Sequence, residues 1–327
     1  MSKTMVIVNP ASANGATRRK WPAVEAALKN AGITFDYEFT CQRADAAERT
    51  RNALQRGYDT IISVGGDGTT NETVNGFFAE GKPVNPNARL GLLCCGTGGD
   101  FVRSAGIPKN IEAAAQVLAR GYVHPTDVGL VRFQTHEGTP GERFFINITD
   151  MGLGGDLVER VNRTSKAMGG FVSFAWAAIL TIFSYRNKPL KLEIDGKPCY
   201  EGMCTVAAIS NGQYFGGGMH VAPDAHLDSG QFTIVVADCL GKLEMLVAMP
   251  AIYQGTHLKH PKVKVWTGTT VRATSTDKVL LDVDGEQPGI LDAEFTLIHG
   301  GINLICNPDL VCACQRPEWL AEAAATR

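Results

Sequence analysis

Residues 61–78 read IISVGGDGTTNETVNGFF, and the character of the chain changes at residue 65. The apolar or small residues at 61–64 suit a buried strand, and two glycines, an aspartate, a third glycine and two threonines follow directly. Glycines let backbone N–H groups approach a phosphate, and a helix that begins there adds partial positive charge. The hydroxyl groups of Thr69 and Thr70 can donate hydrogen bonds to phosphate oxygens. The stretch therefore predicts a strand, a phosphate-binding loop and a helix.

Two more loops have a similar composition. NPASANG at 9–15 and GTGGDF at 96–101 also follow predicted strands, and the carboxyl ends of parallel strands meet at one edge of a sheet. A carboxylate such as Asp67 belongs beside phosphates only with a cation between them, which points to Mg²⁺. The three loops together favour a nucleoside triphosphate with its metal. The alternative is that the glycines serve turn geometry alone, and neither GxxxxGK[ST] nor a first-strand GxGxxG is present.

The first 125 residues alternate between strand and helix patterns, which is typical of a parallel sheet with helices on both faces. We predict strands at 4–10, 33–40, 59–64 and 89–94, and helices at 18–31, 44–56, 70–79 and 110–120.

Beyond residue 127 short strand patterns dominate, and turn signals separate them, as in an antiparallel sandwich or barrel. We therefore predict an α/β nucleotide-binding domain at 1–127 and a β-rich substrate domain at 128–307, with 308–327 packing back on the first domain. The strands are predicted at 128–133, 143–148, 190–195, 203–209, 231–237, 263–267, 270–275, 279–284 and 294–298, and the helices at 156–184 and 242–253.

Composition narrows the possible functions. The 327 residues suit two domains of about 150 residues each, and the net charge of −2 argues against general binding to nucleic acid. The beginning of the chain has no pattern of a secretory signal, and the nine cysteines are scattered, as in reduced cytosolic proteins. The longest apolar run, 171–183, is shorter than the ~20 residues of a membrane span. We expect a cytoplasmic protein in which this run forms a buried or groove-lining helix.

Five motifs follow one another along the chain: GGDGTTNETVNGF (65–77), GLLCCGTGGDFVRSAGIP (91–108), NITDMGLGGDLVERVN (147–162), ISNGQYFGGGMHVAPDAHLDSGQFTIV (209–235) and VDGEQPG (283–289). They resemble those of the diacylglycerol-kinase-type bacterial soluble lipid kinases of the NAD-kinase-like superfamily. The resemblance covers almost the whole chain. It implies an α/β nucleotide domain, a β-rich domain, and transfer of the γ-phosphate of ATP to the hydroxyl of a diacylglycerol, phosphatidylglycerol or sphingoid-type lipid.

The resemblance also implies roles for individual residues. Asp67 is the essential acid of the ATP phosphate loop, and Glu286 is the proton acceptor for the lipid hydroxyl. By themselves, the residues DGE around Glu286 indicate only a hairpin turn, and Thr40 is equally explained as the N-cap of the helix at 44–56. The residues expected to contact ATP are Asn9, Thr40, Gly65, Gly66, Asp67, Gly68, Thr69, Thr70, Asn71 and Thr97.

The chain departs from the family pattern at two positions. Gly99 stands where the family has asparagine, which removes a side-chain contact near the nucleotide. Ser229 replaces an aspartate that holds a structural Mg²⁺, and a hydroxyl is a poor substitute for a carboxylate. We expect that this metal is absent or is held by Asp228 and Asp224.

The sequence signals for lipid binding are less specific than those for nucleotide binding. The run 171–183 and the segment MLVAMPAIYQ (245–254) are predicted to line a groove for acyl chains, although ordinary core packing explains them equally well. The partners implied are a lipid substrate at the inner membrane surface, through peripheral contact, and a possible homodimer. An NAD kinase and a non-catalytic lipid or nucleotide sensor are the alternative functions.

Overall fold

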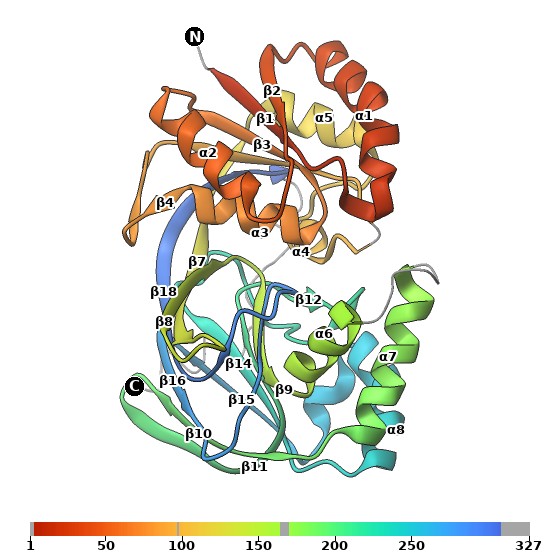
Figure 1. Cartoon of the computed structure of the whole chain (residues 1–327), viewed down its shortest axis with the longest axis vertical. Helices are drawn as coiled ribbons and strands as arrows, with labels where there is room; N and C mark the ends of the chain where they lie inside the picture. Colours follow the sequence, from red (N-terminus) through yellow and green to blue (C-terminus); the bar gives the residue numbers. More distant parts are fainter. Residues whose placement is uncertain (1–2, 97, 164–169, 309–327) are drawn as a thin grey trace.

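The computed structural model of the chain describes residues 3–96, 98–163 and 170–308 (Figure 1). Of the sequence predictions, the nucleotide contact of Thr97 and the packing of the C-terminal segment from residue 309 onward lie outside the described residues.

The first domain is a parallel sheet in the strand order β2-β1-β3-β6. Helices α1 and α5 pack together on one face of the sheet, and α2 and α3 pack together on the other (Figure 1). The elements are β1 (Thr4–Val8), α1 (Ser12–Asn30), β2 (Phe35–Phe39), α2 (Asp45–Gln55), β3 (Thr60–Gly65), α3 (Asp67–Gly76), β4 (Phe78–Ala79), β5 (Lys82–Pro83), β6 (Arg89–Cys94), α4 (Asp100–Ser104) and α5 (Ile111–Arg120).

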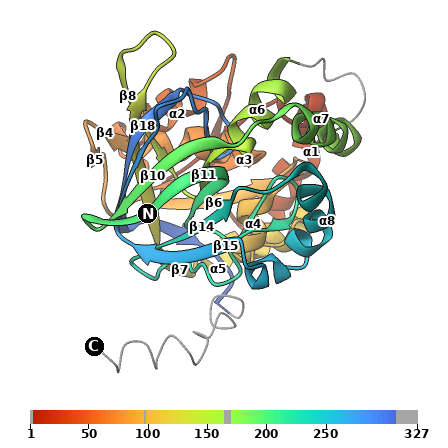
Figure 2. The ribbon, with the colours of Figure 1, turned by 90° about the horizontal axis from the view of Figure 1, so that it is seen from below.

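The second domain is antiparallel, as predicted, and three helical segments lie at one side of it (Figures 1 and 2). The predicted helix at 156–184 is two helices, α6 and α7. The elements are β7 (Val123–Gln134), β8 (Pro140–Phe145), β9 (Ile148–Gly152), α6 (Leu153–Arg163), α7 (Gly170–Ser184), β10 (Lys188–Ile194), β11 (Lys197–Ser210), β12 (Tyr214–Phe215), β13 (Met219–His220), β14 (Phe232–Asp238), α8 (Lys242–Tyr253), a 3₁₀ helix η2 (Thr256–Lys259), β15 (Val263–Gly268), β16 (Thr270–Thr274), β17 (Leu281–Val283) and β18 (Ile290–Ile305).

Two long strands connect the domains. β18 pairs antiparallel with β7 over most of its length, and near its end Asn303 pairs in parallel with Arg89 of β6. The first-domain sheet is therefore completed by a strand from the end of the chain. The predicted domain boundary at residues 127 and 128 falls within β7.

Each domain has its own apolar core. Residues such as Ile7, Ile61 and Leu90 fill the first, and the stacked rings of Phe145 and Phe232 lie in the second. The predicted fold class, an α/β domain followed by a β-rich domain, is confirmed.

Candidate functional site

The glycine loop after β3 turns directly into α3. Gly66 is the N-cap of this helix and Asp67 is its first residue. A Cβ atom added to Gly96 would lie 3.1 Å from the Cα of Gly66, so the backbones of the loops at 65–72 and 96–101 pass close to each other. Glycine is required here because of this contact. The structure thus brings the predicted loops together at one edge of the sheet, beside the N-terminus of α3.

The first strand contributes Asn9 to this edge. Its side-chain amide donates to the hydroxyl of Thr69 at 2.9 Å, and its backbone N–H donates to the carbonyl of Val64. Thr40 is buried at the end of β2, where its N–H donates to the carbonyl of Val8. Asn9 and Thr40 therefore directly follow neighbouring strands, and Thr69 lies in the first turn of α3, as the sequence predicts.

The alternative role of Thr40 as a helix N-cap is wrong. Helix α2 begins at Asp45, and its N-cap is Ala44 in a left-handed conformation. The carboxylate of Glu72, on α3, accepts hydrogen bonds from the N–H groups of Ala44 and Ala46 at 2.9 and 3.3 Å. A neighbouring helix thus supplies the acceptor that the local sequence lacks.

Asp67 connects the two glycine loops. Its carboxylate accepts backbone N–H groups from Gly99, Asp100 and Phe101 at 2.9, 3.4 and 3.3 Å. Three donors stabilise the charged form of a carboxylate. Asp67 therefore fixes the position of the segment that leads into α4, in addition to any contact with a metal.

Asp100 is a second carboxylate at this edge, and the sequence analysis gave it no role. One of its oxygens accepts the N–H of Gly217 at 2.7 Å, and the other is buried without a partner among the described residues. Burial is the main cause that raises the pKa of Asp100, and the charge of Asp67 raises it further. A neighbouring pair of carboxylates with an orphaned oxygen fits Mg²⁺, whose other ligands would be water and phosphate oxygens.

The departure at Gly99 has a local explanation. Gly99 adopts a φ of +66°, and a Cβ atom there would lie 2.8 Å from the sulfur of Cys94 and 3.1 Å from Cε of Lys109. Lys109 also donates a hydrogen bond to the carbonyl of Gly98. The side chains of Cys94 and Lys109 occupy the space that an asparagine at position 99 would need.

The predicted hairpin turn around Glu286 is confirmed. Val283 and Glu286 exchange both backbone hydrogen bonds, at 2.7 and 3.1 Å, and Asp284 and Gly285 between them have positive φ angles. This is the geometry of a two-residue hairpin. A Cβ atom added to Gly68 would lie 3.5 Å from Oε1 of Glu286. The turn therefore places the predicted base of the second domain against the phosphate loop of the first.

Arg43 also lies beside the carboxylate of Glu286. Its guanidinium group forms an ion pair with Oε2 of Glu286. Arg43 lies in the loop after β2, and its side chain is 73% exposed, against 26% for Glu286. The two carboxylate oxygens thus have different neighbours, because Oε2 meets Arg43 and Oε1 faces Gly68.

Asn71 faces the second domain. Its amide nitrogen donates to Asp284 at 2.8 Å and to the carbonyl of Phe144 at 2.9 Å, and its oxygen accepts from Arg143 at 2.6 Å. These contacts fill the hydrogen-bonding capacity of the amide group. A nucleotide contact of Asn71 stays a prediction, and the structure gives the side chain a role at the domain junction.

The carboxylate of Asp284 explains why one predicted strand, 143–148, is split between β8 and β9. It accepts the N–H groups of Ile146, Asn147 and Ile148 at 2.9 to 3.1 Å. These amides would otherwise pair within a sheet. The pKa of Asp284 is raised by burial, which the hydrogen bonds oppose.

A buried pair of carboxyl groups stabilises the hairpin turn that carries Glu286. Asp150 and Asp282 face each other across β9 and β17 and are 0% and 2% exposed. Asp282 accepts the N–H of Gly285 at 2.7 Å, whereas the oxygens of Asp150 have no partner with normal hydrogen-bond geometry in the described part of the chain. Burial raises the pKa of Asp150 to about 7 and that of Asp282 well above its ordinary value, the latter also through the charge of Asp150. The pair therefore retains a proton near neutral pH.

A large apolar cavity of about 720 Å³ lies between the sheet and helices α6, α7 and α8. Ala178, Thr181 and Ile182 of α7 line it, together with Met249 and Ile252 of α8. The prediction that the segments 171–183 and 245–254 line a groove is confirmed for these residues. The volume lies in the range of small-molecule sites.

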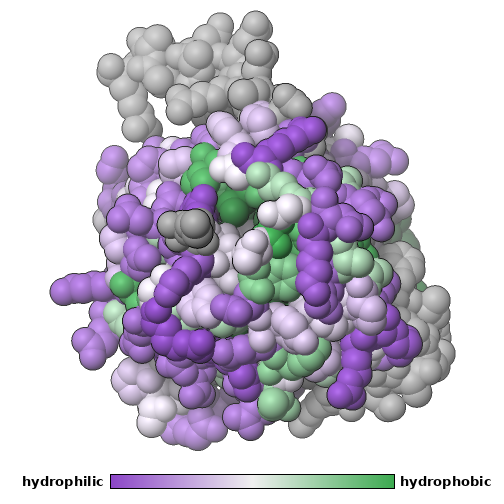
Figure 3. Space-filling view, turned by 90° about the horizontal axis from the view of Figure 1, so that it is seen from above, coloured by the Kyte–Doolittle hydropathy of each residue, from purple (hydrophilic) through white to green (hydrophobic). Residues whose placement is uncertain are grey.

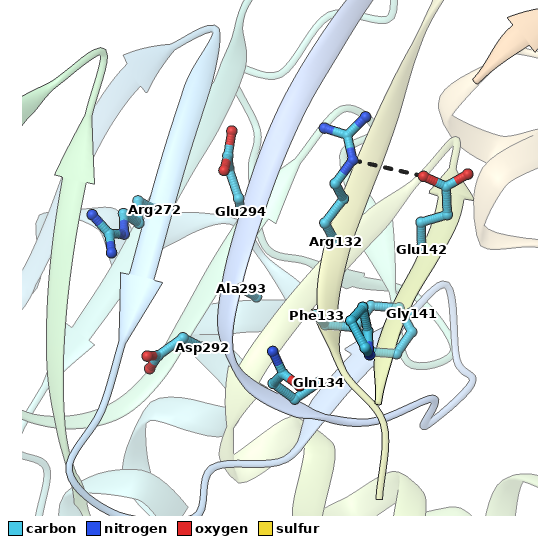
Figure 4. Close-up of a pocket in the computed structure, with 10 residues that line it drawn as sticks. Arg132, Phe133, Gln134, Gly141, Glu142, Arg272, Asp292, Ala293 and Glu294 are labelled. Atoms are coloured by element: carbon cyan, nitrogen blue, oxygen red, sulfur yellow. Dashed lines mark ion pairs between the residues drawn. The ribbon is translucent and has the colours of Figure 1, made fainter. Parts of the chain in front are cut away.

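A second hollow, of about 480 Å³, lies on the outer face of the β7, β16 and β18 strands (Figure 4). Charged side chains project from this face, and Arg132 pairs with Glu142 at 3.6 Å. None of the predicted site residues lines it. We assign the hollow no part in the chemistry of Glu286 and the glycine loops.

One of the two predicted metal residues of the second domain, Asp228, has another partner. Asp228 lies 3.3 Å from Nε2 of His124, and the hydroxyl of Ser229 donates to the carbonyl of Gln231 within its own turn. Among the residues that the structure describes, no three His, Cys, Asp or Glu side chains gather closely enough to hold a metal ion. A metal held by Asp228 and Asp224 therefore stays a prediction without further support.

Comparison with solved structures identifies the class of fold. A diacylglycerol kinase from Bacillus anthracis superposes with a TM-score of 0.68 at 22% identity, covering 95% of this chain and 98% of the other. An NAD kinase from Archaeoglobus fulgidus in complex with ATP gives a TM-score of 0.52 at 13% identity, covering 95% and 96%. The architecture is that of the NAD-kinase-like proteins.

Comparison of sequences identifies the family. Residues 3–131 match the diacylglycerol kinase catalytic domain, and residues 148–306 match the YegS C-terminal NAD kinase beta sandwich-like domain. A diacylglycerol kinase of Staphylococcus carnosus is 30% identical over 311 residues, or 94% of this chain and 96% of the relative. The chain belongs to the diacylglycerol kinase family, which confirms the predicted resemblance, and it is a lipid kinase.

In the described part of the chain, no helix combines the length and the apolar character that crossing a bilayer requires.

Proposed function

We propose that the protein transfers the γ-phosphate of ATP to the hydroxyl of a diacylglycerol, with Glu286 as the general base. The observation that carries the proposal is the position of Glu286. Its Oε1 atom faces Gly68 in the phosphate loop, although the two residues belong to different domains. A proton acceptor beside the transferred phosphate suits phosphoryl transfer to an alcohol.

The nucleotide phosphates would lie at the N-terminus of α3, against the glycines of both loops and the hydroxyl of Thr70. Backbone N–H groups and the helix dipole favour negative charge at such a position. Asp67 and Asp100 would hold the Mg²⁺ ion that accompanies ATP. That ion supplies charge neutralisation between the phosphates and the two carboxylates.

Glu286 would act on the lipid hydroxyl. Oε1 takes the hydroxyl proton while the lipid oxygen bonds to the γ-phosphorus, and the bond from that phosphorus to the β–γ bridging oxygen of ATP breaks. ADP leaves, and the protonated Glu286 returns its proton to water. Arg43 holds Oε2 throughout, so that Oε1 stays directed towards the phosphate loop.

The acyl chains would occupy the apolar cavity between α6, α7, α8 and the sheet. Gly154 lines this cavity, and a Cβ atom added to Gly154 would meet the carboxyl group of Asp150. Asp150 faces Asp282, which holds the hairpin that carries Glu286. The cavity and the base are therefore supported by the same buried pair.

The test is a phosphoryl-transfer assay with labelled ATP. Acceptors would be diacylglycerol, phosphatidylglycerol, a sphingoid base and NAD, each with wild-type protein and Glu286→Gln. Labelling of diacylglycerol that Glu286→Gln lowers would support the proposal, and labelling of another lipid would correct the substrate. Labelling of NAD alone would favour an NAD kinase, which the fold also supports, and no labelling of any acceptor would favour a sensor.

We further expect the enzyme to work in the cytoplasm, at the inner face of the membrane, because both ATP and the lipid are available there. The thiols fit this environment. Seven cysteines in the described residues are free, and burial raises the pKa of the buried ones such as Cys204 and Cys306. Protonated, buried thiols react slowly.

A further inference from the structure

Helices α7 and α8 carry exposed apolar side chains on adjacent outer surfaces. Phe183 of α7 is 61% exposed, and Leu243 and Val247 of α8 are 74% and 71% exposed. These are the three highest exposures among the large apolar side chains whose exposure the structure gives. The two helices pack against each other at the same side of the molecule (Figures 1 and 2). We call Ile179, Leu180, Phe183, Leu243 and Val247 the apolar face.

The exposed apolar residues recur at helical intervals along each helix. In α8, Leu243, Val247 and the exposed Pro250 follow one another at intervals of four and three residues, and in α7 Leu180 and Phe183 are three apart. Residues at these intervals lie on one side of a helix. A surface helix of a water-soluble domain normally places charged residues there.

The apolar face borders the apolar cavity. Leu243 and Val247 line the cavity although both are more than two-thirds exposed. A side chain that is exposed to water and also lines a cavity lies at its rim. The cavity therefore opens on the apolar face.

Two exposed basic residues lie on the segments that adjoin this opening, one on η2 and one directly after α7. Lys259 lines the cavity and is exposed, and Arg186 is exposed three residues beyond Phe183. Neither forms an ion pair with any described residue of the chain. Glu244, the one carboxylate among the described residues that line the cavity, is paired with Lys262 at 2.8 Å. Lys259 thus offers positive charge at the rim, and Arg186 offers it at the end of α7, beside the apolar face.

We propose that the apolar face docks on an anionic lipid bilayer and passes the lipid substrate directly into the cavity. This proposal rests on the proposed function. Apolar side chains enter the acyl region while Arg186 and Lys259 meet anionic headgroups, the combination that holds peripheral proteins at a membrane. The acyl chains then move from the bilayer into the cavity without crossing water.

A bilayer explains the face better than a second copy of the chain does. A copy seated on Leu243 and Val247 would close the cavity that opens between them, and the substrate would lose its route. A membrane leaves that route open. Figure 3 shows the molecule from the side of the first domain, where hydrophilic side chains predominate around a central group of apolar ones.

The first test measures sedimentation with phosphatidylcholine vesicles that contain phosphatidylglycerol. Phe183 does not line the cavity, so Phe183→Glu and the double variant Leu180→Glu/Phe183→Glu change docking alone. The bound fraction should fall about 10-fold or more, since one buried aromatic side chain contributes at least that factor. Tyr122→Glu, which alters a 41% exposed aromatic residue of the first domain, should bind like wild type. Arg186→Gln should weaken binding about fivefold, and only to vesicles with phosphatidylglycerol.

The second test separates docking from catalysis. With a water-soluble short-chain diacylglycerol, kcat/KM of Phe183→Glu should equal that of wild type, whereas with long-chain diacylglycerol in vesicles it should fall in parallel with binding. Equal vesicle binding and equal vesicle activity of all variants would overturn the docking proposal. So would a wild-type dimer that Phe183→Glu dissociates without loss of vesicle binding. Absence of lipid phosphorylation by wild type, with vesicle binding intact, would overturn the proposed function instead.

Discussion

The two ends of the proposed substrate site, the phosphate loop and the apolar cavity, are built in opposite ways. At the phosphate-loop end, charged side chains are held by hydrogen bonds. Asp284 accepts one from Asn71 of the other domain and others from the backbone N–H groups of Ile146, between β8 and β9, and of Ile148. At the cavity end, apolar side chains of α7 and α8 surround about 720 Å³. The phosphate-loop end depends on the charge of its side chains and the direction of their hydrogen bonds. The cavity end depends on the volume and the apolar character of its lining.

The difference predicts how each end responds to change. Hydrogen bonds to ionised groups contribute about 1.5–3 kcal/mol and depend on atom type, so substitutions of equal size should be damaging at the phosphate-loop end. Apolar packing depends on volume, so only substitutions that change size or add charge should matter at the cavity end. Five substitutions test this contrast.

Glu286→Gln should have the largest effect. The amide keeps the size of the side chain but accepts no proton, so turnover should fall about 10²–10⁴-fold with little change in ATP affinity. Steady-state kinetics with labelled ATP would measure both. Glu142→Gln, on the outer sheet face, is the matched control and should keep wild-type kinetics. Near-normal turnover of Glu286→Gln would require another base, and loss of ATP binding would make Glu286 a structural residue.

Asp67→Asn should lower turnover roughly 10²–10³-fold, as loss of a preorganised electrostatic contact does. The asparagine side chain has one acceptor oxygen, while three N–H groups bond the carboxylate. We therefore expect a loss of stability of about 1–3 kcal/mol as well, which chemical unfolding would measure. Normal turnover would show that Asp67 has no part in the nucleotide site, and normal stability would show that its bonds to the loop are dispensable.

Ala248→Phe tests the cavity end. Ala248 lines the cavity on α8 and is only partly buried, so the larger ring should reduce the cavity volume. KM for long-chain diacylglycerol should rise about 10-fold, in line with the loss of one or two buried methylene groups of the substrate, while kcat/KM for a short-chain lipid stays constant. Ala248→Ser keeps the volume and serves as the control. An equal effect of both variants would contradict the volume argument.

Asp150→Asn should change how stability depends on pH. The pKa of Asp150 in the folded protein is about 7, above its ordinary value of 3.8. The buried pair therefore contributes its full stability below about pH 4, and this stability is lost as the pH rises through about 7, by up to about 1.4 kcal/mol per pH unit for each group. Asparagine removes one of these groups, so the decline should be less steep.

Urea unfolding at several pH values between about 5 and 8 would measure this slope. Asp277→Asn, an exposed carboxylate, should keep the wild-type slope. An unchanged slope in Asp150→Asn would show that the carboxyl pair does not bind a proton near neutral pH.

Arg43→Ala should have the smallest effect. Ion pairs between exposed side chains contribute about 1 kcal/mol or less, and Arg43 is largely exposed. We expect turnover to fall at most about fivefold, because Glu286 loses a contact that orients it. Arg56→Ala, which removes another exposed arginine that pairs with a glutamate, is the control. A loss as large as that of Glu286→Gln would mean that Arg43 itself acts on the phosphate.

The sequence predicted the parts of the site that local patterns determine. The glycine loop after β3 is a run of small residues directly after an apolar strand. The hairpin at Glu286 depends on the adjacent residues Asp284 and Gly285, which have positive φ angles. Both features are recognisable from consecutive residues in the sequence. The contacts between domains were not predictable in this way. Asn71 meets Asp284 across 213 residues, and Arg43 meets Glu286 across 243.

The sequence analysis missed several residues of the site for one reason. Asp150 and Asp282 face each other only because β9 and β17 pair in a particular antiparallel register, and Asp100 reaches the second domain only through Gly217. No local sequence signal encodes such register and packing. The helix cap supplied by Glu72 to α2 was missed for the same reason.

The long strand β18 also constrains how the protein is made. Its residue Asn303 pairs with Arg89 of β6, so during synthesis the first-domain sheet waits, with β6 as an open edge, until nearly the whole chain has emerged. Contacts so distant in sequence form slowly, and an uncovered strand edge readily pairs with other chains. The first domain therefore cannot mature alone on the ribosome, and a chain stopped before β18 should aggregate instead of leaving a stable nucleotide-binding fragment.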